Sequence, residues 1–169
     1  MELLFEDLAN YHKLPDKYKK DKKFLLRALK KEDSLMKYMW NDFKDDEDFI
    51  LNAIKIDPDF IKYFPKQLND VDFNIKSLDY NKNMHYAATE EILNNKKFAL
   101  EAVKKSENSF YSLSKTLQTD PDVFLEAIKN PKFHILTYHP LFRKNEAFSK
   151  EVVKIRPKLT KLLPKNFIS

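Results

Sequence analysis

Five lysines recur at equivalent positions along the 169-residue chain and could together do charge-based chemistry. This lysine row consists of Lys30, Lys55, Lys104, Lys129 and Lys154, and Asp79 takes the corresponding position in the middle of the series. If the segments that carry them stack, the ammonium groups could bind the phosphates of a nucleic acid or an acidic protein. The competing interpretation is structural, because a lysine near the C-terminus of a helix interacts favourably with the helix dipole. We favour the structural interpretation, since acidic residues nearly match the basic ones, 26 against 31.

Residues able to hold a metal or to catalyse a reaction do not converge in the sequence. The four histidines are scattered, at His12, His85, His134 and His139. The last two lie five residues apart, whereas a pair on one helix face that binds zinc needs a spacing of four. Paired acids such as Glu90 and Glu91 are typical of solvated charge or helix caps. We therefore expect no metal, no cofactor and no catalytic residue, and we expect that the protein is not an enzyme.

The composition excludes several classes of site. The chain has no cysteine, which removes disulfides, thiolate metal sites and a cysteine nucleophile. It also has no glycine, which phosphate-binding loops and the nucleophile elbow of hydrolases require. A net charge of +5 and a pI near 9.1 permit nucleic-acid binding without being diagnostic of it. No small-molecule substrate is expected.

The distribution of apolar residues gives no sign of a membrane segment. The first ten residues, MELLFEDLAN, mix acids with apolar side chains and lack the basic start of a signal peptide. No apolar stretch approaches the length that spans a bilayer. We expect a cytoplasmic protein with no membrane partner, and delivery into a host cell stays an open alternative.

A repeated motif fixes the elements that carry these residues. It begins with Asp or Asn, places an aromatic or aliphatic anchor three residues later, and continues with a small residue and then an aliphatic residue and lysine. We call the Asp or Asn the start of each copy and the aromatic or aliphatic residue three positions later its anchor. The starts are Asp21, Asp46, Asp70, Asn95, Asp120 and Asn145, and the anchors are Phe24, Phe49, Phe73, Phe98, Val123 and Phe148. Successive starts lie 24 or 25 residues apart, and a fixed period of this kind is typical of a repeat protein.

The residue types within each copy predict helices. Asp and Asn accept hydrogen bonds from the free amides at a helix N-terminus, so each start should be an N-cap. Apolar residues then recur at helical spacing, with a small residue that lets a neighbouring helix approach. The small residues are Ala28, Ala53, Ser77, Ala102 and Ala127, with Val152 in the last copy. A second, shorter helix should follow, as in DPDFIKYFP (57–65), which opens on Asp-Pro and ends at a proline.

The period and the helix pattern together predict the architecture. We expect an all-α protein, a short α-solenoid of about six 25-residue helical-hairpin repeats with an N-terminal capping helix. Residues 1–169 should form a single domain, with the cap in 1–20 and repeats that start near residues 21, 46, 70, 95, 120 and 145. Most aromatic residues occupy repeat-equivalent positions and should belong to the core.

The repeat resembles a known family. The run D-x-x-F-x-L-x-A-[LIV]-K, followed by a helix and a proline loop, is similar to the repeats of the domain of unknown function number 4116, over about residues 14–167. The resemblance implies stacked helical hairpins of the kind found in bacterial, viral or effector-like proteins. It brings no catalytic residue to this chain.

The third copy departs most from the motif and supplies the candidate site. Asn74, Ser77 and Asp79 replace an aliphatic residue, alanine and lysine. Binding surfaces are often built where a local rule is broken, so we expect Asp79, Tyr80 and His85 to contact a partner. Tyr80, Tyr86 and Trp40 are the aromatic residues that best fit a surface position. We predict a protein–protein interaction module, an adaptor or an inhibitor, and the alternative is nucleic-acid binding through the lysine row.

Overall fold

The computed structural model describes residues 8–133, 141–142 and 144–167. These residues form α-helices and short 3-10 helices, labelled α and η, and no strand lies among them. The chain divides into two compact units, which we call unit 1 (Met1–Ala87) and unit 2 (Ala88–Ser169). The prediction of an all-helical protein is confirmed for the described residues. The prediction of a single domain stays a prediction, and each unit is described by itself.

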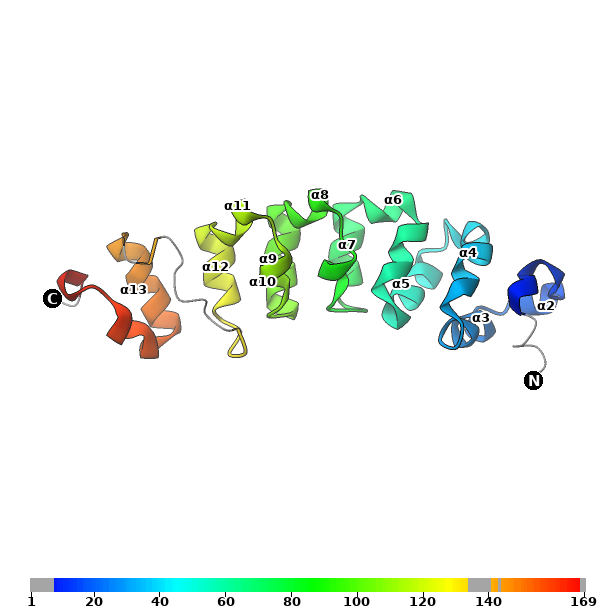
Figure 1. Ribbon diagram of the computed structural model, residues 1–169, viewed down its shortest axis with the longest axis horizontal. Coiled ribbons are helices and arrows are strands. Elements are labelled where there is room, and N and C mark those ends of the chain that lie inside the picture. Colours follow the sequence, from blue (N-terminus) through cyan, green and yellow to red (C-terminus); the bar gives the residue numbers. More distant parts are fainter. Residues whose placement is uncertain (1–7, 134–140, 143, 168–169) are drawn as a thin grey trace. The chain divides into compact units, whose positions relative to one another are not determined.

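Unit 1 holds the elements coloured blue to green in Figure 1. In chain order they are η1 (Leu8–Lys13), α2 (Asp16–Lys19), α3 (Lys22–Leu29), η2 (Asp33–Leu35), α4 (Met36–Met39), η3 (Trp40–Phe43), α5 (Glu47–Ile56), η4 (Pro58–Tyr63), α6 (Pro65–Leu68), α7 (Val71–Ser77) and η5 (Met84–Tyr86). The longest helices, α3, α5 and α7, each follow a start residue of the repeat.

Unit 2 holds the elements coloured green to red in Figure 1. They are α8 (Glu90–Leu93), α9 (Lys96–Lys105), α10 (Ser109–Ser112), α11 (Lys115–Gln118), α12 (Pro121–Ala127), α13 (Glu146–Ile155), η6 (Pro157–Leu162) and η7 (Lys165–Phe167). Helices α9, α12 and α13 again follow start residues. Across the described parts of both units, the helices are too short or too polar to pass through a bilayer.

Every start residue caps the helix that follows it. The Asp46 carboxylate accepts a hydrogen bond from the backbone N–H of its anchor Phe49 at 3.0 Å, and the other five starts do the same for their own anchors. Each bond satisfies one of the amides that a helix N-terminus leaves without an intrahelical partner. The predicted N-caps are therefore confirmed in all six copies.

The anchors and small residues of the motif make up much of the core. All six anchors are buried, with Phe49, Phe98 and Val123 fully so. The small residues are also buried: Ala28, Ala53, Ser77, Ala102, Ala127 and Val152. The phenyl rings of Phe43 and Phe49 stack with their centroids 3.9 Å apart. Burial of an aromatic side chain and of the small residue beside it lets successive helices pack closely.

A third element, absent from the predicted hairpin, precedes most starts. One-turn helices α2, α6, α8 and α11 end two residues before a start. The second helix of the second copy, η4, ends just before Pro65 as predicted, and Pro65 then occupies the first turn of α6. Proline is tolerated there because the first turn has no intrahelical acceptor for its missing N–H. The second helix itself is short, as in the 3-10 helices η4 and η6.

The described part of the cap packs onto the first copy. Tyr11 of η1 is buried, and its hydroxyl donates a hydrogen bond to Asp42 at 2.7 Å. Burial raises the pKa of Tyr11, and the nearby Asp42 carboxylate raises it further. The tyrosine thus stays neutral and holds η1 against the end of η3.

Candidate interaction surfaces

The lysine row lies at the C-terminal ends of the first helices of five copies. Lys30 is the C-cap of α3, while Lys55 and Lys154 occupy the last turns of α5 and α13. All five lysines are exposed. Their helix-end positions agree with the structural interpretation, in which the ammonium group complements the negative end of the helix dipole.

Two members of the lysine row are engaged by acidic neighbours on their own helices. The ammonium of Lys104 lies 2.6 Å from the Glu101 carboxylate, and that of Lys129 lies 2.6 Å from the Glu126 carboxylate. The hydrogen bond to Glu101 raises the pKa of Lys104. These carboxylates would repel a phosphate group that approached either lysine, so the row offers less positive potential than its sequence suggests.

The three candidate residues of the third copy differ in their exposure to solvent. Asp79 is exposed and Tyr80 is half-buried, so both can reach a partner. His85 is only 1% exposed, and its Nδ1 lies 3.2 Å from the Lys82 carbonyl oxygen. The prediction of His85 as a contact residue is therefore wrong, because η5 turns its ring into the core. Tyr86, whose ring centroid lies 4.1 Å from that of His85, is 65% exposed and takes its place at the surface.

The remaining sequence candidates form no site in the described residues. Trp40 is half-buried, and His12 is exposed beside the ring of Tyr38. His134 and His139 lie outside the residues that the structure describes. Within the described ranges, no three His, Asp or Glu side chains are grouped as a metal ion would need.

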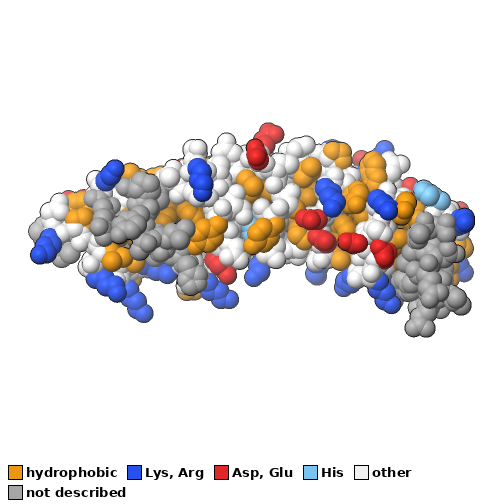
Figure 2. Space-filling model, in the orientation of Figure 1, with side chains coloured by type: hydrophobic (Ala, Val, Ile, Leu, Met, Phe, Trp, Pro, Cys, Tyr) orange, Lys and Arg blue, Asp and Glu red, His pale blue; other side chains and the backbone are white. Residues whose placement is uncertain are grey.

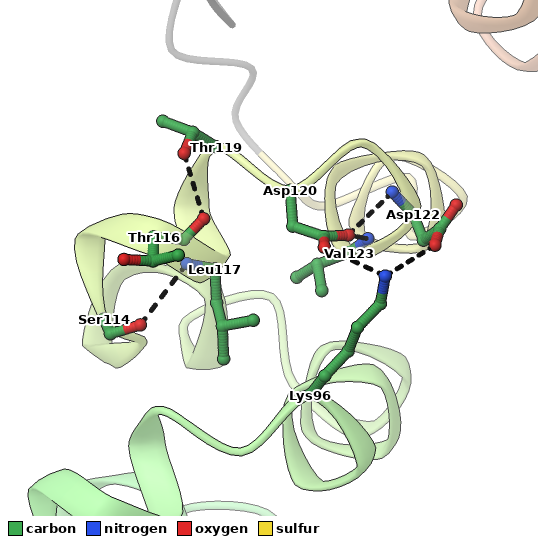
Figure 3. A network of polar contacts seen from close by, with 8 residues as sticks. All are labelled: Lys96, Ser114, Thr116, Leu117, Thr119, Asp120, Asp122 and Val123. Atoms are coloured by element: carbon green, nitrogen blue, oxygen red, sulfur yellow. Dashed lines mark hydrogen bonds and ion pairs between the residues drawn. The ribbon is translucent and has the colours of Figure 1, made fainter.

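Consecutive copies are joined by ion pairs that the sequence reasoning missed. Lys96, one residue after a start, lies between the carboxylates of Asp120 and Asp122, at 2.9 and 2.6 Å (Figure 3). Asp120 is the next start and also caps α12. In unit 1, Lys22 pairs in the same way with the next start, Asp46, at 2.5 Å. The signal was a lysine directly after the starts of copies one and four.

These pairs alter the protonation of the two start residues. Burial alone would raise the pKa of Asp46, but the hydrogen bonds from Lys22 and from the Phe49 amide outweigh it and lower that pKa. The same holds for Asp120: burial alone would raise its pKa, but Lys96 and the amides of α12 outweigh burial and lower it. Each carboxylate therefore stays ionised while it serves both as a cap and as a link between copies.

A second type of link runs from the third copy of each unit to the second. The Asn81 side-chain amide donates to the Ile54 carbonyl at the end of α5, at 3.0 Å. Arg156 stands at the equivalent place, eleven residues after its start, and its Nε donates to the Ile128 carbonyl at 2.8 Å. Nη2 of Arg156 also donates to the carbonyl of Asn130. Both donors satisfy carbonyls that a helix C-terminus leaves open.

The same two copies share a buried polar side chain four residues after the start. Asn74 is fully buried and donates to the carbonyls of Gln67, Leu68 and Asp70 at 3.0, 3.1 and 2.8 Å. Ser149 is fully buried and donates to the carbonyls of Phe142 and Asn145. The Asn74 amino group is thus held by backbone carbonyls, although its buried Oδ1 has no hydrogen-bond partner in the described part of the chain, and the third copy has a counterpart in the sixth.

The two units differ in charge although their helices correspond. Residues 1–87 contain 16 basic and 17 acidic residues, while residues 88–169 contain 15 basic and 9 acidic ones. Figure 2 shows a group of acidic side chains, in red, among the lysines and hydrophobic residues on the face that it presents. The net positive charge of the chain therefore resides in its second half.

A scan for families finds two matches, and both fit the copies described above. The domain of unknown function (DUF4116) matches residues 21–69 and again residues 95–143. Each matched segment begins at a start residue and includes one Lys–Asp link between copies, Lys22–Asp46 or Lys96–Asp120. Searches of curated proteins and of solved structures gave no match. Because the two segments cover more than half of its residues, this chain belongs to the DUF4116 family.

Proposed function

We propose that the protein is a short α-solenoid of about six 25-residue copies that binds another protein and catalyses no reaction. Six capped helices at a spacing of 24 or 25 residues support the repeat, and the links between copies support their stacking. Solenoids of this kind present extended surfaces to macromolecules, and the residues outside the repeat pattern determine what they bind. A cytoplasmic location stays part of this proposal.

One observation carries the proposal: the repeat fixes the core, while the exposed residues diverge. The anchor and the small residue are buried in each copy, and each start caps the helix that follows it. At the exposed end of the first helix, by contrast, Asp79 replaces lysine, and the two units differ in their surplus of basic residues. A common framework with a varied surface suits a protein that recognises a partner through that surface.

The third copy offers the contact residues. Asp79, Tyr80 and Tyr86 combine an exposed carboxylate with two aromatic side chains, and tyrosines are frequent among residues that dominate binding energy. Tyr86 replaces His85 in this proposal because it is the exposed member of that pair.

The test is capture of partners from a lysate of the source organism by the full chain. The triple variant Asp79→Lys/Tyr80→Ala/Tyr86→Ala should lose the proteins that the wild type retains. Tyr111→Ala is the matched control, since Tyr111 is the other large exposed aromatic among the described residues, at 40% exposure. Retention of the same proteins by the triple variant would remove the third copy as the contact surface, and failure to retain any would count against the proposed function itself.

Nucleic-acid binding through the lysine row is the competing function, favoured by the surplus of basic residues in the second half. It predicts that binding to a short oligonucleotide weakens with salt, with a log–log slope of about 3.5 to 4.5 if all five lysines neutralise phosphates. Replacement of Lys55, Lys104 and Lys129 by Met should then reduce the slope by about 2 to 3. We expect instead no specific binding and a stability loss of a few tenths of a kcal/mol for each replacement, roughly the lower range for a charge at a helix end.

A further inference from the structure

Unit 2 carries a groove between the end of α12 and the beginning of η6. Its volume is about 400 Å³. Ile128, Ile155 and Leu159, with Pro131 and Pro157, form its apolar lining. Ile155 and Leu159 pack on the core of unit 2 but remain partly exposed. An apolar side chain placed against these two residues would remove apolar surface of both partners from water, which favours binding.

Basic side chains border this apolar lining. Lys129 and Lys158 both line the groove and both are exposed. Lys129 is paired with Glu126, although 59% of its side chain is still exposed, and Lys158 forms no ion pair within the described residues. Glu126 offsets part of the charge of Lys129, but Lys158 and Arg156 leave the rim with a net positive charge that would attract carboxylates.

Arg156 fixes the shape of the groove. Its guanidinium is committed to the carbonyls of Ile128, Asn130 and Phe133, so it joins the end of α12 to the beginning of η6. Walls that are already fixed lose little conformational entropy when a ligand binds, and this pre-organisation favours affinity.

We propose that this groove docks an acidic segment of a partner protein, with an apolar side chain against Ile155 and Leu159 and carboxylates facing Lys129 and Lys158. The inference rests on the proposed function of protein binding and adds to it a site and the chemistry of the partner. A single-stranded nucleic acid is disfavoured, because such ligands stack their bases on aromatic rings, and the described lining residues include none.

The equivalent place in unit 1 provides an internal control. There Lys55 corresponds to Lys129, Asn83 to Lys158 and Met84 to Leu159. Met84 is fully buried, whereas Leu159 is partly exposed. Unit 1 thus lacks both the second charge and the exposed apolar side chain at this position, although the neighbouring link through Asn81 is present.

The experiment measures binding of the full chain to a fluorescent peptide of sequence EDDLEDFEDD by anisotropy. The double variant Lys129→Glu/Lys158→Glu should weaken binding by about tenfold or more, because like charges then face each other. Lys55→Glu/Asn83→Glu in unit 1 should change it by less than about twofold. Replacement of Leu and Phe in the peptide by Ser should weaken binding to the wild type by about tenfold, as loss of buried apolar groups predicts. Thermal unfolding of each variant shows whether the fold is retained.

Several outcomes would contradict the proposal that the groove docks an acidic segment. They are no binding of the peptide at concentrations up to about 1 mM, equal losses from the variants in the two units, or no effect of the Ser peptide. Tighter binding of a single-stranded oligonucleotide that the groove variant abolishes would assign the site to nucleic acid. The capture experiment with the third-copy variant is independent of this groove, so loss of one does not imply loss of the other.

Discussion

Copies three and six end the two units, and they perform the same two tasks with different side chains. Four residues after the start, Asn74 and Ser149 are both buried donors to backbone carbonyls. Eleven residues after the start, Asn81 and Arg156 both reach back to the preceding helix. The comparison teaches that the position fixes the task, a donor for a carbonyl, while the residue that performs it can vary.

The comparison extends to the whole of each unit. The Lys–Asp link joins the first copy to the second in both units, and the amide or guanidinium link joins the second to the third. Residues that perform the same task lie 74 or 75 residues apart. These links therefore recur with a three-copy period of the sequence motif.

The largest effect should come from the anchors, which the comparison treats as equal in the two units. Phe49→Ala in unit 1 and Phe98→Ala in unit 2 should each destabilise the protein by about 3–5 kcal/mol, the usual result of emptying a buried aromatic site. Urea unfolding would measure both. A loss below about 1 kcal/mol at both positions would mean that the anchors do not carry the core.

The buried donors should distinguish copies three and six. Asn74→Ala should cost about 1–3 kcal/mol, because three carbonyls lose a buried donor, and Ser149→Ala should cost roughly 1 kcal/mol. Asn52→Ala is the control, since Asn52 makes only exposed hydrogen bonds on α5, and should stay within about 0.5 kcal/mol. Equal losses of stability for Asn74→Ala and Asn52→Ala would show that the buried donor four residues after the start has no special role.

The Lys–Asp links should appear in the dependence of stability on acid. Asp120→Ala should cost about 1 kcal/mol through loss of the N-cap, whereas Asp120→Asn retains a capping side chain and should cost a few tenths. The pKa values of Asp46 and Asp120 are lowered in the folded state, so both stabilise the fold above about pH 4. That contribution is lost as the pH falls through their folded-state values.

Denaturant unfolding between about pH 2 and 5 would follow this loss, and Asp46→Asn/Asp120→Asn should flatten the curve. Asp59→Asn is the control, because Asp59 belongs to neither link. If the double variant and the control had the same acid dependence, the links would contribute nothing to it.

The smallest effect should come from His85, which has no histidine counterpart in unit 2. Burial lowers the pKa of His85 in the folded state, and the Lys82 carbonyl opposes this only in part. The unfolded chain therefore takes up the proton first, and stability should decline as the pH falls below about 6.5. His85→Gln should remove this decline, and the exposed His12 is the control: His12→Gln should keep it.

The sequence predicts best what a single copy decides for itself. An Asp or Asn three residues before the Phe or Val anchor acts on the nearest amides, so all six caps could be predicted. Pro65 follows the end of η4 as predicted, but α6, which begins at the same proline, was missed because proline suits the first turn of a helix as well as the position after one. His85 was misplaced because only the packing of η5 decides its burial. Asn74 looked irregular alone, and comparison with Ser149 at the same distance from its start would have revealed the three-copy period.

The carbonyls at the ends of α5 and α12 have a consequence for local unfolding. No described residue has a positive φ angle, and the chain has no glycine with which to close a helix in the usual way. The closing donors come instead from Asn81 and Arg156, which belong to the following copy. When η6 opens, the Ile128 carbonyl loses its donor and the last turn of α12 can fray, so the amide protons of that turn should then exchange with solvent more readily. Local unfolding of the third copy of a unit can in this way destabilise the second copy. The stability of a helix therefore depends partly on the segment that follows it in the sequence.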